Sequence, residues 1–340
     1  QFFATDSSSL SSSGTTVDVA IDTVAPSPSA LTILECQYSL VSDTCFSGSN
    51  TIHLSWTSTS TDISYHGIIK DGLVVATTTL ASTTLALSAN GTYGVNIVAY
   101  DHAGNAATST AQSVEIYTSP IVLNEIAWAG TMAASSDEWI ELYNRTTRTI
   151  NLSNVSLAAD DAVPYIHLSG TIASGAYYLI ERTSTTTTSV AGDLVAVFSG
   201  NGSGSGLGND GEVLNLVYEL GGQASTTLDS TPQLASCGGS WCAGVASTSP
   251  ISMERKNPDV SGSTASNWSS NNTYTKNGTD ANGNAINGTP RARNSVNLLS
   301  IGYYCPSYSS SYVENGYNIP SSSTCTYLSA SMTGNRYGDL

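Results

Sequence analysis

The sequence predicts an all-β protein made of tandem β-sandwiches, with partial sandwich strands at both termini. Short runs that alternate apolar and polar residues recur along the 340 residues, and Gly, Asn, Asp and Ser bound them. This pattern is typical of antiparallel strands joined by turns. No window of a dozen residues combines the helical spacing of apolar positions with helix caps. The length allows two or three domains of ordinary size.

The first complete sandwich is expected at residues 27–118. Its seven predicted strands lie at residues 30–34, 51–60, 63–72, 73–79, 83–89, 92–101 and 113–118, and seven strands in about 90 residues suit one immunoglobulin-like domain. Trp56 is placed to anchor the core, and Tyr93 opens the sixth strand as a candidate tyrosine corner. The stretch "LSANGTYGVNIVAYDHAGNAAT" resembles the fibronectin type III and bacterial immunoglobulin-like families, which implies a fold and little about function.

A second sandwich is expected at residues 119–295. Alternation is clear in "NEIAWAG" and "DEWIELYN". Five further segments follow in order: "INLSNVSL", "LSGTIASGAYYLIER", "LGNDGEVLNL", "SMERKNPD" and "NGTPRARNS". This series resembles the lamin tail domain, an immunoglobulin-like sandwich of nuclear lamins and of bacterial secreted and surface proteins. The segment that carries "CGGSWC" is an insertion into that pattern.

Both ends of the chain resemble parts of a sandwich. Residues 1–26 are similar to its last two strands, F and G: residues 3–6 align with 98–101, and 17–19 with 114–116. We expect this pair to join a neighbouring chain through Phe2, Phe3, Val17, Val19 and Ile21, and a polar tail is the alternative. Residues 296–340 are rich in Tyr and Ser, and within them "NLLSIGYYC" and "CTYLSAS" are similar to the first two strands, A and B.

Charge and hydropathy exclude several classes of function. The net charge is −16, from 26 acids and 10 bases, so binding to nucleic acid or to an anionic membrane surface is not expected. No run of about 18 apolar residues is present, and we expect no membrane insertion. The sequence starts without Met or a signal peptide, which indicates either a mature product or a portion of a longer chain.

Six cysteines form three pairs of near neighbours. The spacing favours disulfides and an oxidising compartment. Zinc is the competing interpretation, but no double CxxC is present and the four histidines are scattered. The expected pairs are Cys36 with Cys45, Cys237 with Cys242, and Cys305 with Cys325.

Nine Asn-x-Ser/Thr sequons suit a glycosylated exterior, although a chain this rich in Asn and Thr also produces such triplets by chance. The candidate sites are Asn90, Asn144, Asn151, Asn154, Asn201, Asn267, Asn271, Asn277 and Asn287.

The residues that could form a catalytic, calcium-binding or phosphate-binding site also have simpler, structural interpretations. Asp137, Glu138 and Glu141 belong to the lamin-tail-like motif, and neighbours in a strand point to opposite faces, so we interpret them as structural. Asp280, Asn282 and Asn284 suggest a calcium loop, but Ala stands where such a loop needs Gly and no distal Glu follows; a β-turn is favoured. The Gly-rich segment at 199–211 lacks the Lys of a phosphate loop. A Ser-His-Asp triad in the second sandwich would depend on His167 alone.

These observations predict a non-catalytic extracellular structural protein without a cofactor. It would be secreted or at the cell surface, as a subunit of a surface filament or layer that copies of the chain build head to tail by strand exchange. One alternative is an adhesive or glycan-binding module of a longer surface protein, with a glycan or a surface protein as ligand; Tyr303, Tyr304, Tyr308 and Tyr312 form its candidate aromatic cluster. Another is the accessory region of a secreted hydrolase.

Overall fold

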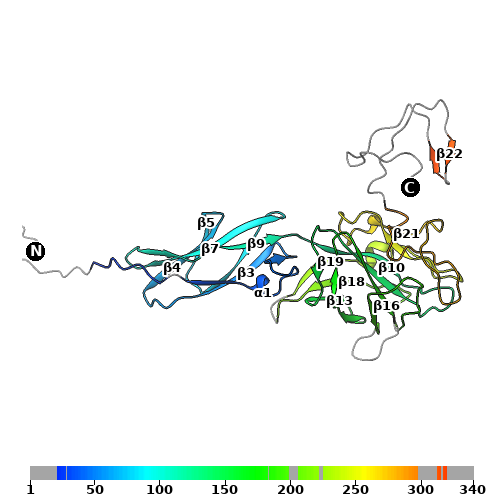
Figure 1. Ribbon diagram of the computed structural model, residues 1–340, viewed down its shortest axis with the longest axis horizontal. Coiled ribbons are helices and arrows are strands. Elements are labelled where there is room, and N and C mark those ends of the chain that lie inside the picture. The colour runs from blue at the N-terminus through cyan, green and yellow to red at the C-terminus, as the bar shows by residue number, and fades with distance from the viewer. Residues whose placement is uncertain are drawn as a thin grey trace, which may run out of the picture. The chain divides into compact units, whose positions relative to one another are not determined.

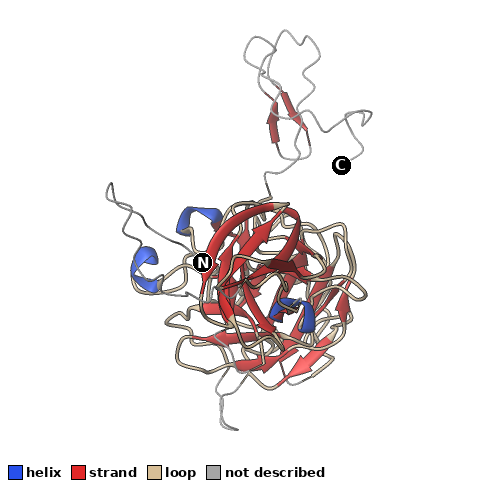
Figure 2. Ribbon diagram, turned by 90° about the vertical axis from the view of Figure 1, so that its left-hand side faces the viewer, coloured by secondary structure: helices blue, strands red, loops and turns tan. Residues whose placement is uncertain are grey.

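The computed structural model describes residues 21–27, 29–182, 184–198, 206–221 and 225–297, and the backbone of two strands at 312–314 and 317–319. The chain divides into two compact units, residues 1–118 and 119–340. Strands dominate both units, and the helical elements are short turns (Figures 1 and 2). Within the described ranges, no helix has the length and apolar character needed to cross a membrane.

The first unit is a sandwich of two sheets. One sheet has the order β1-β3-β6, and the other the order β2-β9-β7-β4-β5 with β8 beside β7. The strands are β1 (Ala30–Ile33), β2 (Phe46–Ser47), β3 (Thr51–Thr57), β4 (Ile63–Lys70), β5 (Leu73–Thr78), β6 (Ser82–Ala86), β7 (Gly91–Asp101), β8 (Ala106–Thr108) and β9 (Gln112–Ile116). All seven predicted strands are present. β2 and β8 were not predicted, because two or three residues are too few to show alternation. The helical turn α1 (Leu34–Gln37), of four residues, was not predicted either.

Alternation along the strands builds the core of this unit. Ile52, Leu54 and Trp56 of β3 are buried, while the residues between them are partly or fully exposed. Burial of each such side chain stabilises the fold by about 1.5–3 kcal/mol. The Tyr93 hydroxyl donates a hydrogen bond to the backbone oxygen of Ala89, four residues upstream, at 2.8 Å. The predicted roles of Trp56 and Tyr93 are therefore confirmed.

The second unit contains a six-stranded sheet, a four-stranded sheet and one pair of short strands. The first has the order β17-β16-β11-β10-β20-β21 and the second β14-β13-β18-β19, and β12 pairs with β15. The strands are β10 (Ile121–Ala127), β11 (Trp139–Asn144), β12 (Ile150–Asn151), β13 (Val155–Ala159), β14 (Tyr165–His167), β15 (Thr171–Ile172), β16 (Tyr177–Arg182), β17 (Leu194–Ala196), β18 (Leu214–Tyr218), β19 (Thr226–Ser230), β20 (Met253–Arg255) and β21 (Trp268–Ser270). Two 3-10 turns, η1 (Leu234–Cys237) and η2 (Ala265–Asn267), complete the unit.

Strand β10 lies at the centre of this unit, and all seven of its residues are buried. β11 flanks it on one side and β20 on the other. The segment at 286–296 has no regular structure but contacts the same strand: Thr289 bonds to Glu125, and Asn294 bonds to Asn124. The unit therefore continues well past its last long strand, β19.

The terminal strands predicted from the sequence lie outside the described residues. Residues 1–20 are among them, and so are residues 298–305 and 325–331 of the two segments proposed as strands A and B. The described C-terminal strands are a different pair, β22 (Tyr312–Glu314) and β23 (Tyr317–Ile319), which are antiparallel. This pair was not predicted from the sequence.

Candidate functional site

Three glutamates from neighbouring strands meet in the interior of the second unit. Glu125 of β10 lies opposite Glu141 of β11 and opposite Glu254 of β20. None of the three has any solvent exposure. Only Glu141 was a candidate from the sequence. The signal for Glu125 was a single acid in a strand that is otherwise almost entirely apolar, whereas Glu254 stands beside Arg255 in a strand of three residues and gave no such signal.

Hydrogen bonds from loop residues hold each carboxylate. Thr289 donates its backbone N–H to Glu125 at 2.9 Å, and Ser252 donates its hydroxyl to the same carboxylate. Asn271 and Ser295 both donate to Glu254 at 2.6 Å.

Glu141 is held in the same way. It accepts hydrogen bonds from the Asn124 amide, at 2.7 Å, and from the backbone N–H of Arg291. All three carboxylates therefore fasten the segment around 289–296, or the loop beside it, to the sheet.

The Thr289 hydroxyl shows that this cluster contains a proton. Its Oγ1 lies 2.9 Å from Glu125 Oε2 and 3.0 Å from Glu254 Oε1. A hydroxyl donates only one hydrogen bond, so one of the two carboxyl groups must be protonated and donate to Oγ1. Burial, together with the charges of Glu254 and Glu141, raises the pKa of Glu125 well above its ordinary value. Burial also raises the pKa of Glu254, and it raises that of Glu141 to about 8.

This cluster has the residues of an acid–base site but not its access. Catalytic carboxylates must converge on a substrate, and these three are sealed from solvent with their oxygens already accepting protein hydrogen bonds. The other acids of the "DEWIELYN" motif do not converge with them: Asp137 accepts a bond from Thr131, and Glu138 pairs with Arg182 at 2.9 Å. The arrangement serves to hold the fold together.

A buried ion pair joins the two sheets of the unit. Arg255 of β20 pairs with Asp229 of β19, and both are almost fully buried. The guanidinium also donates to the backbone oxygen of Leu123 at 2.9 Å and lies 5.8 Å from the ring of Trp268. Removal of one partner would leave the other charge buried without compensation, which typically costs about 3–5 kcal/mol.

Ser156, His167 and Glu219 come together, but not as a catalytic triad. Ser156 Oγ lies 2.9 Å from His167 Nδ1 and 2.7 Å from Glu219. Glu219 approaches the same ring nitrogen, at 3.6 Å, whereas a triad needs the serine and the acid on opposite nitrogens of the imidazole. Ser156 is also fully buried, so its hydroxyl is not available as a nucleophile.

The suggested calcium loop is a turn held by its own hydrogen bonds. Asp280 Oδ1 accepts bonds from the backbone N–H groups of Asn282 and Asn284, and the Asn284 side chain donates to the same carboxylate. Asp101 organises the same D-x-x-G-N loop in the first unit, accepting from Ala103 and Asn105. The Asp280 carboxylate is therefore occupied by the turn that the sequence analysis favoured.

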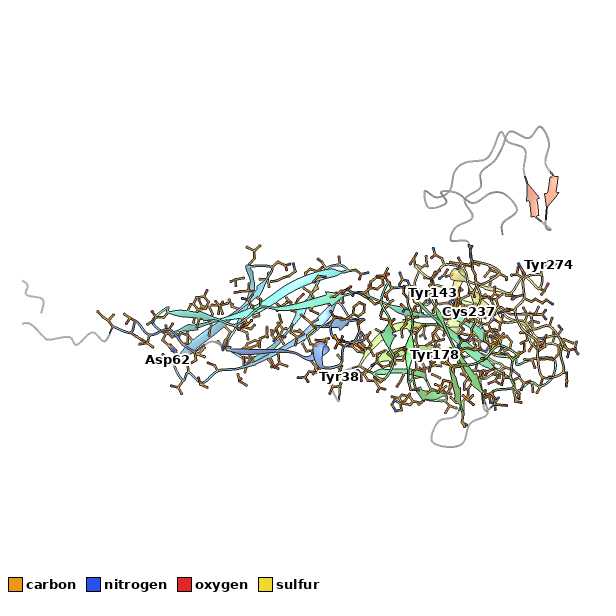
Figure 3. The ribbon with its side chains drawn as sticks, viewed as in Figure 1. Tyr38, Asp62, Tyr143, Tyr178, Cys237 and Tyr274 are labelled. Carbon is orange, nitrogen blue, oxygen red and sulfur yellow. A yellow bond between two sulfur atoms is a disulfide. The ribbon has the colours of Figure 1, made fainter. Side chains whose placement is uncertain are left out.

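A second group of acids gathers in the first unit. One carboxylate oxygen from each of Asp22, Asp62 and Asp101 lies within 4.8 Å of the others. Figure 3 places Asp62 at one end of this unit. Among the described residues this is the only group of three or more His, Cys, Asp or Glu side chains at metal-binding distance. Nothing in the sequence indicated this group, because its three residues are far apart in the chain.

Most of one segment that matches a known family lies in the second unit. Residues 114–231 match the Lamin Tail Domain family. The chain contains a lamin tail domain. This confirms the resemblance seen in the sequence, and the all-β, immunoglobulin-like fold is confirmed with it. The strands β20 and β21 lie beyond the matched residues but belong to the same sheet as β10.

Three solved structures are similar to the chain. A DUF4876 family protein from Bacteroides thetaiotaomicron is 12% identical, with a TM-score of 0.32, over 58% of this chain and 84% of that one. The fibronectin(III)-like modules of Clostridium thermocellum CbhA are 13% identical, with a TM-score of 0.24, over 59% and 91%. The BSP domain of a biofilm associated protein is 12% identical, with a TM-score of 0.17, over 54% and 28%. The search of curated proteins returned no match.

The described part of the chain contains two disulfides. Cys36 is bonded to Cys45 in the first unit, and Cys237 to Cys242 beside the lamin tail domain, where Figure 3 marks Cys237. The second disulfide encloses Trp241, whose ring stacks on that of Trp128 at 5.9 Å. The insertion "CGGSWC" thus packs an aromatic side chain against the end of β10. Cys305 and Cys325 lie outside the described residues.

The asparagines of the nine sequons differ in their solvent exposure. The amide nitrogen to which an N-glycan would attach donates to backbone oxygens at four buried positions, so these sites are not available in the folded chain: Asn144, Asn267, Asn271 and Asn287. Asn151, Asn154 and Asn277 are partly buried, and Asn201 lies outside the described residues. Asn90 is exposed, and its carbonyl oxygen accepts a hydrogen bond from Thr118.

Most residues predicted for assembly lie outside the described chain. Phe2, Phe3, Val17 and Val19 are among them. Ile21 is described and is 82% exposed. Tyr303, Tyr304 and Tyr308 are outside as well, and only the backbone of Tyr312 is described, in β22.

Proposed function

We propose that the protein is a non-catalytic extracellular structural protein, a subunit of a surface filament or surface layer that assembles by strand exchange. Two β-sandwich units and two disulfides suit a secreted or cell-surface location. The interior acids of the second unit accept hydrogen bonds from neighbouring protein groups, which supports a structural role without catalysis.

The observation that carries strand exchange is the structure of the segment that the N-terminus resembles. Residues 98–101 and 114–116, with which residues 3–6 and 17–19 align, belong to β7 and β9. These two strands pair antiparallel through residues 91–95 and 112–116, with Tyr93 opposite Val114. Each depends on the rest of the sandwich: Val95, Ile97, Val114 and Ile116 are all fully buried. An isolated hairpin of this kind is marginally stable in water.

The same requirement applies to residues 1–25. Val17 and Val19 correspond to Val114 and Ile116, and Phe3 corresponds to Val98. A partner that covers them has to supply the missing strands of a sandwich. A neighbouring copy supplies them when its C-terminal segment, 296–340, provides strands A and B, and head-to-tail repetition then produces an open filament.

Deletion of residues 1–25 tests the proposal. The truncated chain should form no polymers by electron microscopy or light scattering, while far-ultraviolet circular dichroism shows that the two units remain folded. Substitution of Val17 and Val19 by Asp should have the same effect, and Thr16→Asp, on the opposite side of the predicted strand, is the matched control. Polymers of normal length from the truncated chain would overturn strand exchange.

A second candidate function is glycan binding, and one described feature favours it. Tyr65 and Tyr100 stack on each other with ring centroids 4.7 Å apart, and Tyr65 is exposed. Exposed aromatic rings are the platforms expected of a glycan-binding module. Binding of the wild type but not of Tyr65→Ser to a glycan array would support this function, and equal binding by both would refute it.

A further inference from the structure

The first unit has an exposed sheet edge at β5. This strand is the last in the order β2-β9-β7-β4-β5, and no described strand pairs with its outer side (Figure 1). Its backbone N–H and C=O groups on that side are available to another strand, which proteins usually prevent with charges, prolines or very short edges. One bulge, opposite Ile68 and Ile69, is the only such device here.

The side chains of this edge are apolar and exposed. Leu73 is 71% exposed, Val74 52% and Val75 48%, and Leu80 just after the strand is 67% exposed. Single exposed leucines are common, but a row of apolar side chains along one edge marks an interaction site.

The other sheet provides an internal comparison. Its edge strand β6 buries Leu85 and turns serine and threonine side chains outward. The exposure of β5 is thus specific to that edge and does not follow from the chain's general composition.

The distribution of charge favours a second copy of the same chain as the partner. Two chains of net charge −16 repel each other, so they approach most easily where charge is absent. Residues 72–100 contain no Asp, Glu, Lys or Arg, and the preceding Lys70 and Asp71 neutralise each other at 3.0 Å. An antiparallel arrangement also directs the Lys70–Asp71 turns of two copies to opposite ends of the contact. Such an uncharged edge has nothing to select a charged partner.

We propose that β5 pairs antiparallel with β5 of a second copy, so that one continuous sheet runs through two chains. The contact is two-fold and closed, because each copy uses the same strand. It differs from the head-to-tail contact of the proposed function, which uses residues 1–25, and it would join two filaments side by side.

Disulfide cross-linking of the full chain tests this contact. Ala76 lies near the centre of β5 and is exposed, so Ala76→Cys should form a covalent dimer at micromolar concentration on mild oxidation. One new cysteine per chain limits the product to a dimer, whatever polymers the termini build. Ser82→Cys, exposed on the β6 edge, is the matched control. Equal rates of dimer formation from the two variants would overturn the proposal.

A charge on the edge supplies the second measurement. Val75→Lys should weaken self-association in sedimentation velocity at least tenfold, and it should slow cross-linking when combined with Ala76→Cys. Ser82→Lys should change neither result. Since Val75 is already exposed, the lysine needs no rearrangement of the core, and circular dichroism checks that the chain is folded. A Val75→Lys chain that self-associates like the wild type refutes the contact at β5. Loss of polymers on deletion of residues 1–25 tests the head-to-tail contact of the proposed function and does not test the contact at β5.

Discussion

Substitution of Glu125 by Gln should stabilise the second unit at neutral and alkaline pH. In the wild type, the proton on the Glu125–Thr289–Glu254 chain is retained in the folded state, because burial raises the pKa of Glu125 well above its ordinary value of 4.5. Gln carries the same hydrogen permanently: its Nε2 replaces Oε2 and donates to Thr289 Oγ1, while its oxygen still accepts from Ser252 and from the Thr289 N–H.

The sign follows from proton counting. A carboxyl group whose pKa is raised in the folded state contributes stability that is complete below its unfolded pKa and is lost as the pH rises towards the folded pKa. Above the ordinary pKa of 4.5 the unfolded chain loses this proton, whereas the folded chain, in which the pKa is raised, retains it. The free energy of unfolding should therefore fall by about 1.4 kcal/mol per pH unit for each such group. Glu125→Gln lacks one such group, so its free energy of unfolding should fall less steeply with pH, by about 1.4 kcal/mol per pH unit.

Urea unfolding at several pH values measures the effect. Four of the five tryptophans lie in the second unit, so their fluorescence follows its unfolding. Glu219→Gln is the control, since it removes the same charge from a carboxylate whose pKa is lowered in the fold by hydrogen bonds from Tyr165 and Ser156, against the opposing effect of burial. Its stabilisation is lost only as the pH falls below about 4.5, so the slope between pH 5.5 and 7.5 should not change. An unchanged slope in Glu125→Gln would refute the shared proton.

Three further predictions concern stability and modification. Arg255→Met should lower the free energy of unfolding by about 3–5 kcal/mol, because Asp229 would stay buried without its countercharge; Arg291→Met, at a partly exposed pair, should cost much less, and equal losses in urea would contradict this. Tyr93→Phe should destabilise the first unit by about 1 kcal/mol through loss of one hydrogen bond, measured as thermal unfolding against Tyr65→Phe, and no difference between the two would count against the tyrosine corner. Peptide mapping of protein secreted from a glycosylating host should find Asn90 modified, and a glycan at any of four positions would contradict the buried sequons: Asn144, Asn267, Asn271 and Asn287.

Local patterns determined the strands. Ile52, Leu54 and Trp56 alternate with polar residues, and this alternation predicts a half-buried strand without knowledge of its neighbours. The same local logic located the tyrosine corner and, through the order of its motifs, the lamin tail domain. Strands of two residues such as β2 carry too little pattern and were not predicted.

Only the tertiary structure determined which polar side chains are buried and which groups they pair with. In the sequence, three acids are separate residues of three strands: Glu125, Glu141 and Glu254. They form one cluster because β11 and β20 flank β10. The sequon at Asn144 reads as a surface site, yet its amide bonds to backbone oxygens inside the fold. Alternation is a property of neighbouring residues, so the sequence by itself determined the all-β sandwich and its apolar core. Burial and pairing of a polar group depend on which distant strand covers it, and only the folded chain decides that.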